Sequence, residues 1–208
     1  LFIVEGDSAG GCWFGATKVA LADGRNLSFF ELIEEEKQGK KNFCYTMRDD
    51  GHIGVAPILN VRRTKQNAEV TKIILDNNEE LICTPDHPFR LVDGSYMPAN
   101  QLTTLHNITP LYKRLSSKSD KGKGLDGYET IFDPKSKKWM YTHVLSDIYN
   151  LTNNIYKYSD GKHRHHVDFN KLNNNPTNIK RLTYEHHMQV HYSHLENTLH
   201  RPDVKIKS

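Results

Sequence analysis

Short apolar runs and turn-forming residues alternate along the first hundred residues. The runs are TKVAL, NFCYTM, GVAPILNVRR, EVTKIIL, ELICT and PFRLV, and the residues between them include ADGR, RDDG, LDNN and VDGS. Runs of this length between turns predict an all-β module of many short strands. One helix interrupts the strands at SFFELIEEEKQGK, where Ser28 and Glu31 have the spacing of a capping box and Gly39 supplies a stop.

The second half of the chain has a different pattern. Residues 115–127, LSSKSDKGKGLDG, hold few apolar positions and predict a linker or an exposed loop. YETIFD and KKWMYT predict a hairpin around PKSK, and HVLSDIYNL predicts a short helix. KHRHHVDFNKLNNNPTNI is so rich in His and Asn that we expect a loop-dominated ribbon in place of a regular element. It leads into a predicted helix, TYEHHMQVHYSHLENTL, with Thr183 as the N-cap.

The composition is that of an ordinary globular protein, with 37% hydrophobic and 25% charged residues among 208. No apolar run approaches the roughly 20 residues of a membrane span, and no secretory signal is visible. We therefore expect a cytoplasmic protein without a membrane partner. Cys12, Cys44 and Cys83 are an odd number without a CxxC pair, which argues against a disulfide framework and a cysteine-ligated zinc.

The small net charge of +3 hides a difference between the two halves. Residues 1–104 hold 11 Lys and Arg against 15 Asp and Glu, whereas residues 105–208 hold 17 against 10. Most of the histidines also lie in the second half. A basic, histidine-rich half favours a polyanion and a metal as partners, and a solvated basic surface is the alternative that charge alone leaves open.

Cys12 is a candidate nucleophile because it follows two glycines, which leave the Gly11–Cys12 bond unhindered. A thiol can attack the carbonyl of its own preceding residue if other groups protonate the departing nitrogen and stabilise the oxyanion. Thr84 and His87, three residues apart in CTPDHPF, can supply those functions. By composition alone, His87 also fits an ordinary loop histidine.

Two segments carry a resemblance to inteins. CWFGATKVALADGR resembles their N-terminal block, and LICTPDHPFRLVDGSYMPANQL resembles their second block with its T-x-x-H turn. The resemblance implies a mainly β Hint (Hedgehog/intein) horseshoe over residues 12–105. It also implies that Cys12 makes an N–S acyl shift at Gly11–Cys12 with help from Thr84 and His87.

The residues before Cys12 resemble a different family. LFIV reads as a buried strand, and EGDSAGG resembles the toprim motif of the B subunit of DNA gyrase and related type II topoisomerases. In that family the residue matching Glu5 serves catalysis and magnesium binding. The remaining carboxylates of such a site are absent here, so we interpret residues 1–11 as host sequence and Glu5 as a relic of an interrupted site.

The histidine-rich segment is a candidate metal site. His187 and His191 are four residues apart and so share one face of the predicted helix, which suits coordination of one cation. A polar surface loop with incidental histidines is the structural alternative. The order of paired histidines, an Asn-rich turn and H-x-x-x-H over residues 163–191 resembles HNH endonucleases, which carry a small α+β (ββα-metal) domain.

The HNH resemblance implies a role for each matching residue. His166 matches the general base that activates water, and Asn178 matches the central asparagine that pins the loop and orients the base. His165 and His187 match ligands of a single divalent ion, with His191 as a further ligand or a helix neighbour. We expect Mg²⁺, with Mn²⁺ or Zn²⁺ left open because many relatives have aspartate where His165 stands. Double-stranded DNA is the implied partner, with phosphate contacts from Lys135, Lys137, Lys138, Lys162, Arg164, Lys171, Lys180 and Arg181.

These interpretations divide the chain into five parts: N-extein 1–11, Hint domain 12–105, linker 106–127, HNH domain 128–200 and tail 201–208. The later intein blocks are missing, so we expect the N-terminal part of a splicing intein, split or truncated, that needs a C-terminal fragment with its C-extein. Its nuclease is expected to cut the intein-free host gene. The alternatives are a DNA-binding or defective remnant without nuclease activity, a topoisomerase fragment, and a Hedgehog-like autoprocessing domain.

Overall fold

The computed structural model describes residues 11–120 and 125–199, with side chains as far as residue 195. The predicted strand LFIV, residues 5–10 of the toprim-like stretch and the predicted tail 201–208 lie outside the described residues. Within the described part, no helix has both the length and the apolar character needed to cross a membrane.

Four antiparallel hairpins of consecutive strands make up the first region of the fold. They confirm the prediction of many short strands. The pairs are β1 (Lys18–Ala20) with β2 (Asn26–Ser28), β3 (Phe43–Met47) with β4 (Ile53–Pro57), β5 (Thr71–Ile74) with β6 (Glu80–Cys83), and β7 (Pro88–Arg90) with β8 (Tyr96–Pro98), which the short 3-10 helix η1 (Ala99–Gln101) follows.

The run GVAPILNVRR is only partly a strand, because β4 ends at Pro57 and residues 58–70 form no strand. Asn60 has φ of 55°, in the left-handed region that a continuing strand cannot adopt. The chain therefore leaves the sheet here and runs as an irregular segment to β5.

Helix α1 (Phe29–Lys37) begins at the predicted capping box. The Ser28 hydroxyl accepts from the Glu31 N–H at 3.3 Å, and the Glu31 carboxylate accepts from the Ser28 N–H at 2.8 Å. Gly39, with φ of 76°, follows the helix as the left-handed residue that commonly ends one. Leu32 is the buried residue that anchors α1 on the core.

The described part of the second region, residues 106–120 and 125–199, holds five strands and two α-helices. Strands β9 (Lys113–Leu115), β10 (Glu129–Asp133) and β11 (Lys138–Tyr141) form a sheet in the order β11-β10-β9. The sheet is followed by helix α2 (Thr142–Thr152) and the 3-10 turn η2 (Tyr158–Asp160). Next come β12 (His163–His166) and β13 (Ile179–Leu182), an antiparallel pair joined through η3 (Pro176–Asn178). Helix α3 (Tyr184–Leu199) is the last described element.

Three predictions for this region are confirmed: the hairpin around PKSK, the helix over HVLSDIYNL and the C-terminal helix. The Thr183 hydroxyl accepts from the His186 N–H at 3.3 Å, as expected of an N-cap. Two others hold in part. Residues 116–120 form a loop as expected, but residues 113–115, inside the range 106–127 assigned to a linker, form β9, which pairs with β10. Residues 167–175 of the predicted ribbon are loop, but residues 163–166 form a regular strand, β12, which pairs with β13.

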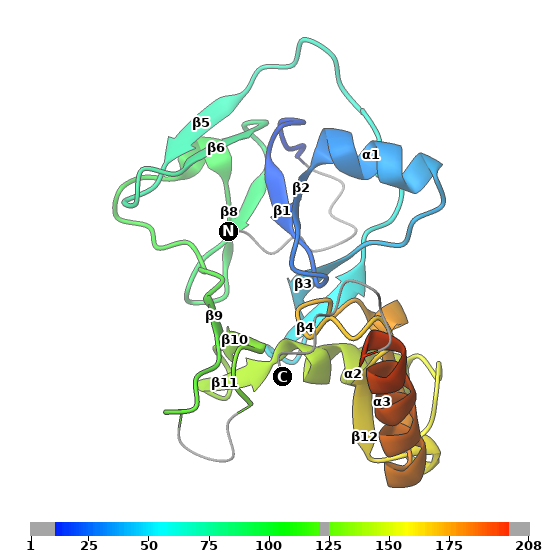
Figure 1. Ribbon diagram of the computed structural model, residues 1–208. Helices are drawn as coiled ribbons and strands as arrows, with labels where there is room; N and C mark the ends of the chain where they lie inside the picture. Colours follow the sequence, from blue (N-terminus) through cyan, green and yellow to red (C-terminus); the bar gives the residue numbers. More distant parts are fainter. Residues whose placement is uncertain (1–10, 121–124, 200–208) are drawn as a thin grey trace.

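The hydrophobic core joins the two regions. One buried cluster combines residues of β1, β3 and β4 with Ile131 of β10 and Leu145 of α2. Figure 1 shows α2 between β4 and the β12 hairpin, where it packs on both. This cluster therefore links described residues before 106 with described residues after 127, whereas the division into Hint and HNH domains stays a prediction.

Candidate functional site

The Gly11–Cys12 bond lies at the end of β6. Residues 12–14 run antiparallel to this strand, with a bridge between Trp13 and Cys83. Two hydrogen bonds fix the junction: the Cys12 N–H donates to the Thr84 hydroxyl at 2.8 Å, and the Thr84 N–H donates to the Cys12 carbonyl at 2.8 Å. Thr84 itself is buried.

His87 packs directly against the same bond. A Cβ added to Gly11 would lie 2.4 Å from the His87 Cα and 2.8 Å from its Nδ1, and Gly11 has φ of 92°, so only glycine fits here. The Trp13 ring lies 4.1 Å from the imidazole, centroid to centroid. Burial lowers the pKa of His87 to about 4, against the opposing effect of the Asp86 carboxylate. The structure thus brings Cys12, Thr84 and His87 together.

Sequence reasoning missed two groups near this bond. The Thr64 Oγ1 lies 3.1 Å from the Cys12 Sγ. Asp86 lies next to Thr84, whose hydroxyl lowers the pKa of the Asp86 carboxyl by hydrogen bonding. A cleft of about 770 Å³ adjoins the thiol and Thr64, lined by Gly11, Cys12 and residues of the irregular segment after β4. Asp86 was visible within the T-x-D-H turn, but Thr64 comes from a distant loop and has no sequence signal.

Three predicted metal ligands converge on one point. β12 supplies His165, and α3 supplies His187 and His191 one turn apart. Their nearest ring nitrogens all lie within 4.8 Å of one another. His165 is buried and the other two are half-buried.

Low pKa values of His165 and His187 favour their neutral form, which can bind a cation. Burial, with the neighbouring His191 and His187, lowers the pKa of His165 to about 4. Burial and His191 likewise lower the pKa of His187. Neutral imidazoles hold a lone pair for a metal, so the donor set fits a divalent ion.

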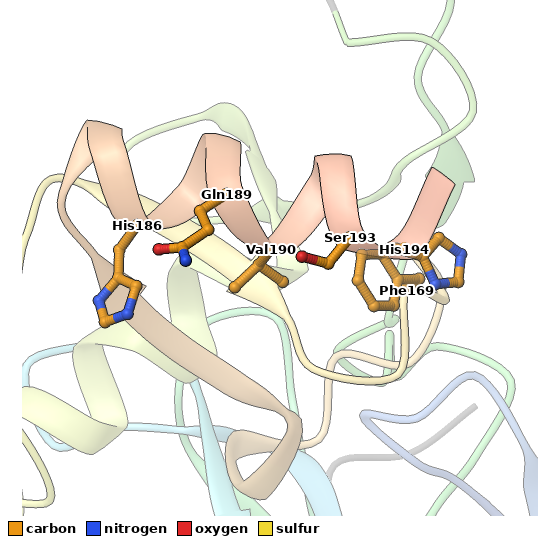
Figure 2. A pocket seen from close by; sticks show the side chains of 6 residues that line it. All are labelled: Phe169, His186, Gln189, Val190, Ser193 and His194. Atoms are coloured by element: carbon orange, nitrogen blue, oxygen red, sulfur yellow. The ribbon is translucent and has the colours of Figure 1, made fainter. Parts of the chain in front are cut away.

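Phe169 covers one side of the cluster. Its ring contacts His165 and His191 at centroid distances of 5.0 and 5.4 Å, and stacks on His194 at 3.7 Å. The residue has φ of 60°, a strained conformation for a bulky side chain. The adjoining groove has a volume of about 400 Å³. In Figure 2, Phe169 and His194 lie together at one end of the groove. All the lining side chains except Phe169 come from α3: His186, Gln189, Val190, Ser193 and His194.

His166 does not join the three-histidine cluster. Successive residues of β12 point to opposite faces, so His166 faces the rings of Tyr128 and His143 at centroid distances of 6.1 and 5.7 Å. It is buried, and its Nε2 lies 3.0 Å from the Asn174 Oδ1.

Asn178 holds the loop that connects β12 to η3. Its side-chain nitrogen donates to the Asp168 carboxylate and to the Asn173 carbonyl, both at 2.8 Å. Its side-chain oxygen accepts from the Asp168 N–H at 3.1 Å. Asn178 thus contacts the loop that it was expected to pin, but none of these bonds reaches His166, the base that it was expected to orient.

No family model matches the chain. It is similar to the B subunit of DNA gyrase from Synechocystis sp., with 55% identity over 207 residues. The match covers 100% of this chain but only 19% of the relative. The chain is thus similar along its whole length to one part of a gyrase B protein, which agrees with the resemblance of EGDSAGG.

Two of the eight predicted phosphate contacts have another role. Arg181 donates to the buried Asp147 carboxylate through Nε and Nη2, both at 2.7 Å, and Arg164 donates through Nε at 2.6 Å. The Arg181 side chain is only 6% exposed. Asp147 on α2 binds both guanidinium groups and ties the β12–β13 hairpin to that helix, so burial leaves Arg181 little surface for a phosphate. Arg164 is 34% exposed, and its phosphate contact stays a prediction.

Proposed function

We propose that the chain is the N-terminal part of a protein-splicing intein inserted in a gyrase B protein, and that it carries an HNH-type homing endonuclease. Residues 1–11 are then host sequence, and a C-terminal intein fragment with its C-extein is the splicing partner. The single observation that carries the proposal is the convergence of His165, His187 and His191 beside a loop that Asn178 holds.

The three imidazoles would hold the divalent ion of the nuclease. Such an ion stabilises charge on the scissile phosphate and on the leaving oxygen. Nitrogen-only donors suit Mn²⁺, Zn²⁺ or another transition metal better than Mg²⁺, which prefers oxygen ligands and retains several waters. Of the ions that the HNH resemblance left open, the donor set therefore favours the softer ones.

His166 acts as the general base in this proposal. It takes a proton from the water whose oxygen forms the new bond to phosphorus, while the bond from phosphorus to the leaving oxygen breaks. Asn178 keeps the loop after His166 in place, and exposed lysines near the hairpin hold the DNA backbone. Only a few side chains are needed, because the ion would stabilise the negative charge on the phosphate and the leaving oxygen, while His166 removes the proton from the water.

A plasmid assay tests the nuclease. The full chain is incubated with a supercoiled plasmid carrying an uninterrupted gyrase B gene, with Mn²⁺, Mg²⁺, Zn²⁺ or EDTA. We expect metal-dependent cleavage that falls about 100-fold or more in His166→Ala, since a general base contributes about 10²- to 10⁴-fold. The control is His186→Ala, an exposed residue of the same helix as His187. Binding without cleavage in every metal would favour the DNA-binding or defective remnant.

A second observation supports the splicing half of the proposal. The Gly11–Cys12 bond is enclosed by Thr84 on one side and by His87 on the other, and the thiol faces an open cleft. Buried Cys44 and Cys83, whose pKa values rise to about 12 and 11 through burial, are unsuited to nucleophilic attack.

The proposed acyl shift balances within the chain. The Cys12 sulfur forms a bond to the Gly11 carbonyl carbon, the carbon–nitrogen bond breaks, and the thiol proton ends on the Cys12 amine. Because burial lowers the pKa of His87 to about 4, its imidazole is neutral at pH 7 and can take up the thiol proton and pass that same proton to the departing nitrogen. The product is a thioester between Gly11 and the Cys12 side chain.

Thiol treatment followed by mass spectrometry tests this step. A strong thiol exchanges with the thioester and releases residues 1–11 from the full chain. We expect release from the wild type, none from Cys12→Ala, and slower release from His87→Ala. The control is His106→Ala, because His106 forms its hydrogen bond with Thr103 instead. An intact chain under these conditions, with or without a matching C-terminal fragment, would refute the splicing claim.

A further inference from the structure

His166 has a hydrogen-bond partner that the sequence did not indicate. Its Nε2 lies 3.0 Å from the Oδ1 of Asn174, a residue with no exposed surface. The rings of Tyr128 and His143 pack around the same imidazole but contact it through ring faces and edges. Asn174 is therefore the group that can select the tautomer of His166.

The orientation of the Asn174 amide follows from its other contacts. Its Nδ2 donates to the Leu172 carbonyl at 3.3 Å, and a carbonyl can only accept. The amide nitrogen must therefore face Leu172, which leaves the oxygen facing His166. Because that oxygen accepts, the Nε2 of His166 carries a hydrogen, and in the neutral imidazole the lone pair then sits on Nδ1.

The backbone of Asn174 is fastened to two other elements. Its N–H donates to the Ala22 carbonyl at 2.9 Å, and its carbonyl accepts from the hydroxyl of Ser146 in α2. Ala22 lies in the turn between β1 and β2 and has no exposed surface. The loop before β13 is thus held by a turn of the first region. This region, residues 12–105, is the splicing region of the proposed function.

Gly24 makes this approach possible. It lies in the same turn with φ of 87°, and a Cβ added there would lie 3.2 Å from the Leu172 carbonyl oxygen. Next to Asn174, the Asn175 side chain donates to the Lys41 carbonyl at 3.1 Å, which is a further bond to the first region. The bonds to the Ala22 and Lys41 carbonyls, together with the Ser146 hydroxyl, therefore set the position of Asn174.

We propose that Asn174 is the positioning residue of His166, and that the turn containing Ala22 and Gly24 keeps it in place, so that DNA cleavage depends on the folded splicing region. The inference rests on the proposed nuclease function. It predicts that the two activities cannot be separated by dividing the chain between residues 105 and 128. It also predicts one tautomer of His166, with hydrogen on Nε2.

Histidine-labelled NMR on the full chain tests the tautomer directly. The wild type is expected to show His166 with hydrogen on Nε2 and a bare Nδ1, and Asn174→Leu is expected to lose this preference. In the plasmid assay, Asn174→Leu should lower kcat about 100-fold while the KM for DNA changes little, because removing a base costs about 10²- to 10⁴-fold. Hydrogen on Nδ1 in the wild type would overturn the inference.

A matched pair of glycine variants tests the dependence on the turn. Gly24 and Gly94 both follow an aspartate in a hairpin turn, with φ of 87° and 92°, but the Cβ of Gly94→Ala would approach only the end of the Arg90 side chain, at 3.5 Å. Both substitutions carry similar backbone strain. We expect Gly24→Ala to lower cleavage well below that of Gly94→Ala, and equal rates in the two variants would refute the coupling.

The outcomes separate this inference from the nuclease proposal. If the wild type cuts no DNA in any metal, the nuclease proposal fails, and the NMR reading of His166 still decides the role of Asn174. If the wild type cuts DNA but Asn174→Leu cuts equally well, the nuclease stands and the positioning role is refuted.

Discussion

Replacing Asp147 with Asn should destabilise the protein strongly, because this carboxylate holds the β12–β13 hairpin on α2. Asp147 is 1% exposed, and it accepts two hydrogen bonds from Arg181, one from Arg164 and one from the Tyr156 hydroxyl. The variant leaves the guanidinium of Arg181, itself 6% exposed, without a counter-charge. Breaking a buried pair from one side costs about 3–5 kcal/mol.

Two further variants sharpen this prediction. Arg164→Ala should cost about 1 kcal/mol or less, since its side chain is 34% exposed and partly screened by water. The double variant Asp147→Leu, Arg181→Met removes both buried charges and should recover much of the stability lost in Asp147→Asn. The contrast between one missing charge and two distinguishes an uncompensated charge from a general loss of packing.

Urea unfolding of the full chain, followed by circular dichroism at pH 7, measures these free energies. Burial opposes ionisation of Asp147, but hydrogen bonds from Arg181 and Arg164 lower its pKa below the unfolded value. The contribution of the Asp147 carboxylate to the free energy of unfolding is therefore fully present above its unfolded pKa of about 3.9. It is lost as the pH falls through the lower pKa that Asp147 has in the folded protein. A free-energy change below about 1 kcal/mol for Asp147→Asn would refute the reasoning.

Three other predictions follow from the described contacts. Ser28→Ala removes the N-cap of α1 and should cost about 1 kcal/mol in the same urea assay. His191→Ala should weaken Zn²⁺ binding at least about tenfold in calorimetry, whereas the exposed His186→Ala should not. Hydrogen bonds from Ser136 and Ile53 outweigh burial and lower the pKa of Asp133 to about 2, so Asp133→Asn should flatten the loss of stability between about pH 4 and pH 2 in acid titrations.

Local patterns in the sequence predicted the parts of the fold that depend on neighbouring residues. The capping box of Ser28 and Glu31 is decided within one helical turn, and the spacing of His187 and His191 places both on one face of α3. The T-x-x-H spacing likewise predicted that Thr84 and His87 lie close together. Their contact with Cys12 depends on the pairing of Trp13 with Cys83 at the end of β6, which the sequence does not indicate.

Contacts between distant segments explain what the sequence could not indicate. Asn174 is one of many asparagines in its loop, and its importance depends on a carbonyl in the turn after β1. Arg181 looked like a phosphate contact because its partner, Asp147, lies on another element. Residues 106–127 looked like a linker because β9 is only three residues long and gains its stability from pairing with β10.

The central claim, that the three-histidine site belongs to a homing nuclease, is tested most directly by mapping cuts on two end-labelled DNA duplexes. One spans the EGDSAGG codons of an uninterrupted gyrase B gene, and the other spans the same codons interrupted by the coding sequence of this chain. With Mn²⁺, we predict a cut at or near the uninterrupted codons and none in the interrupted duplex. Equal cutting of both duplexes, or of neither, would contradict the account.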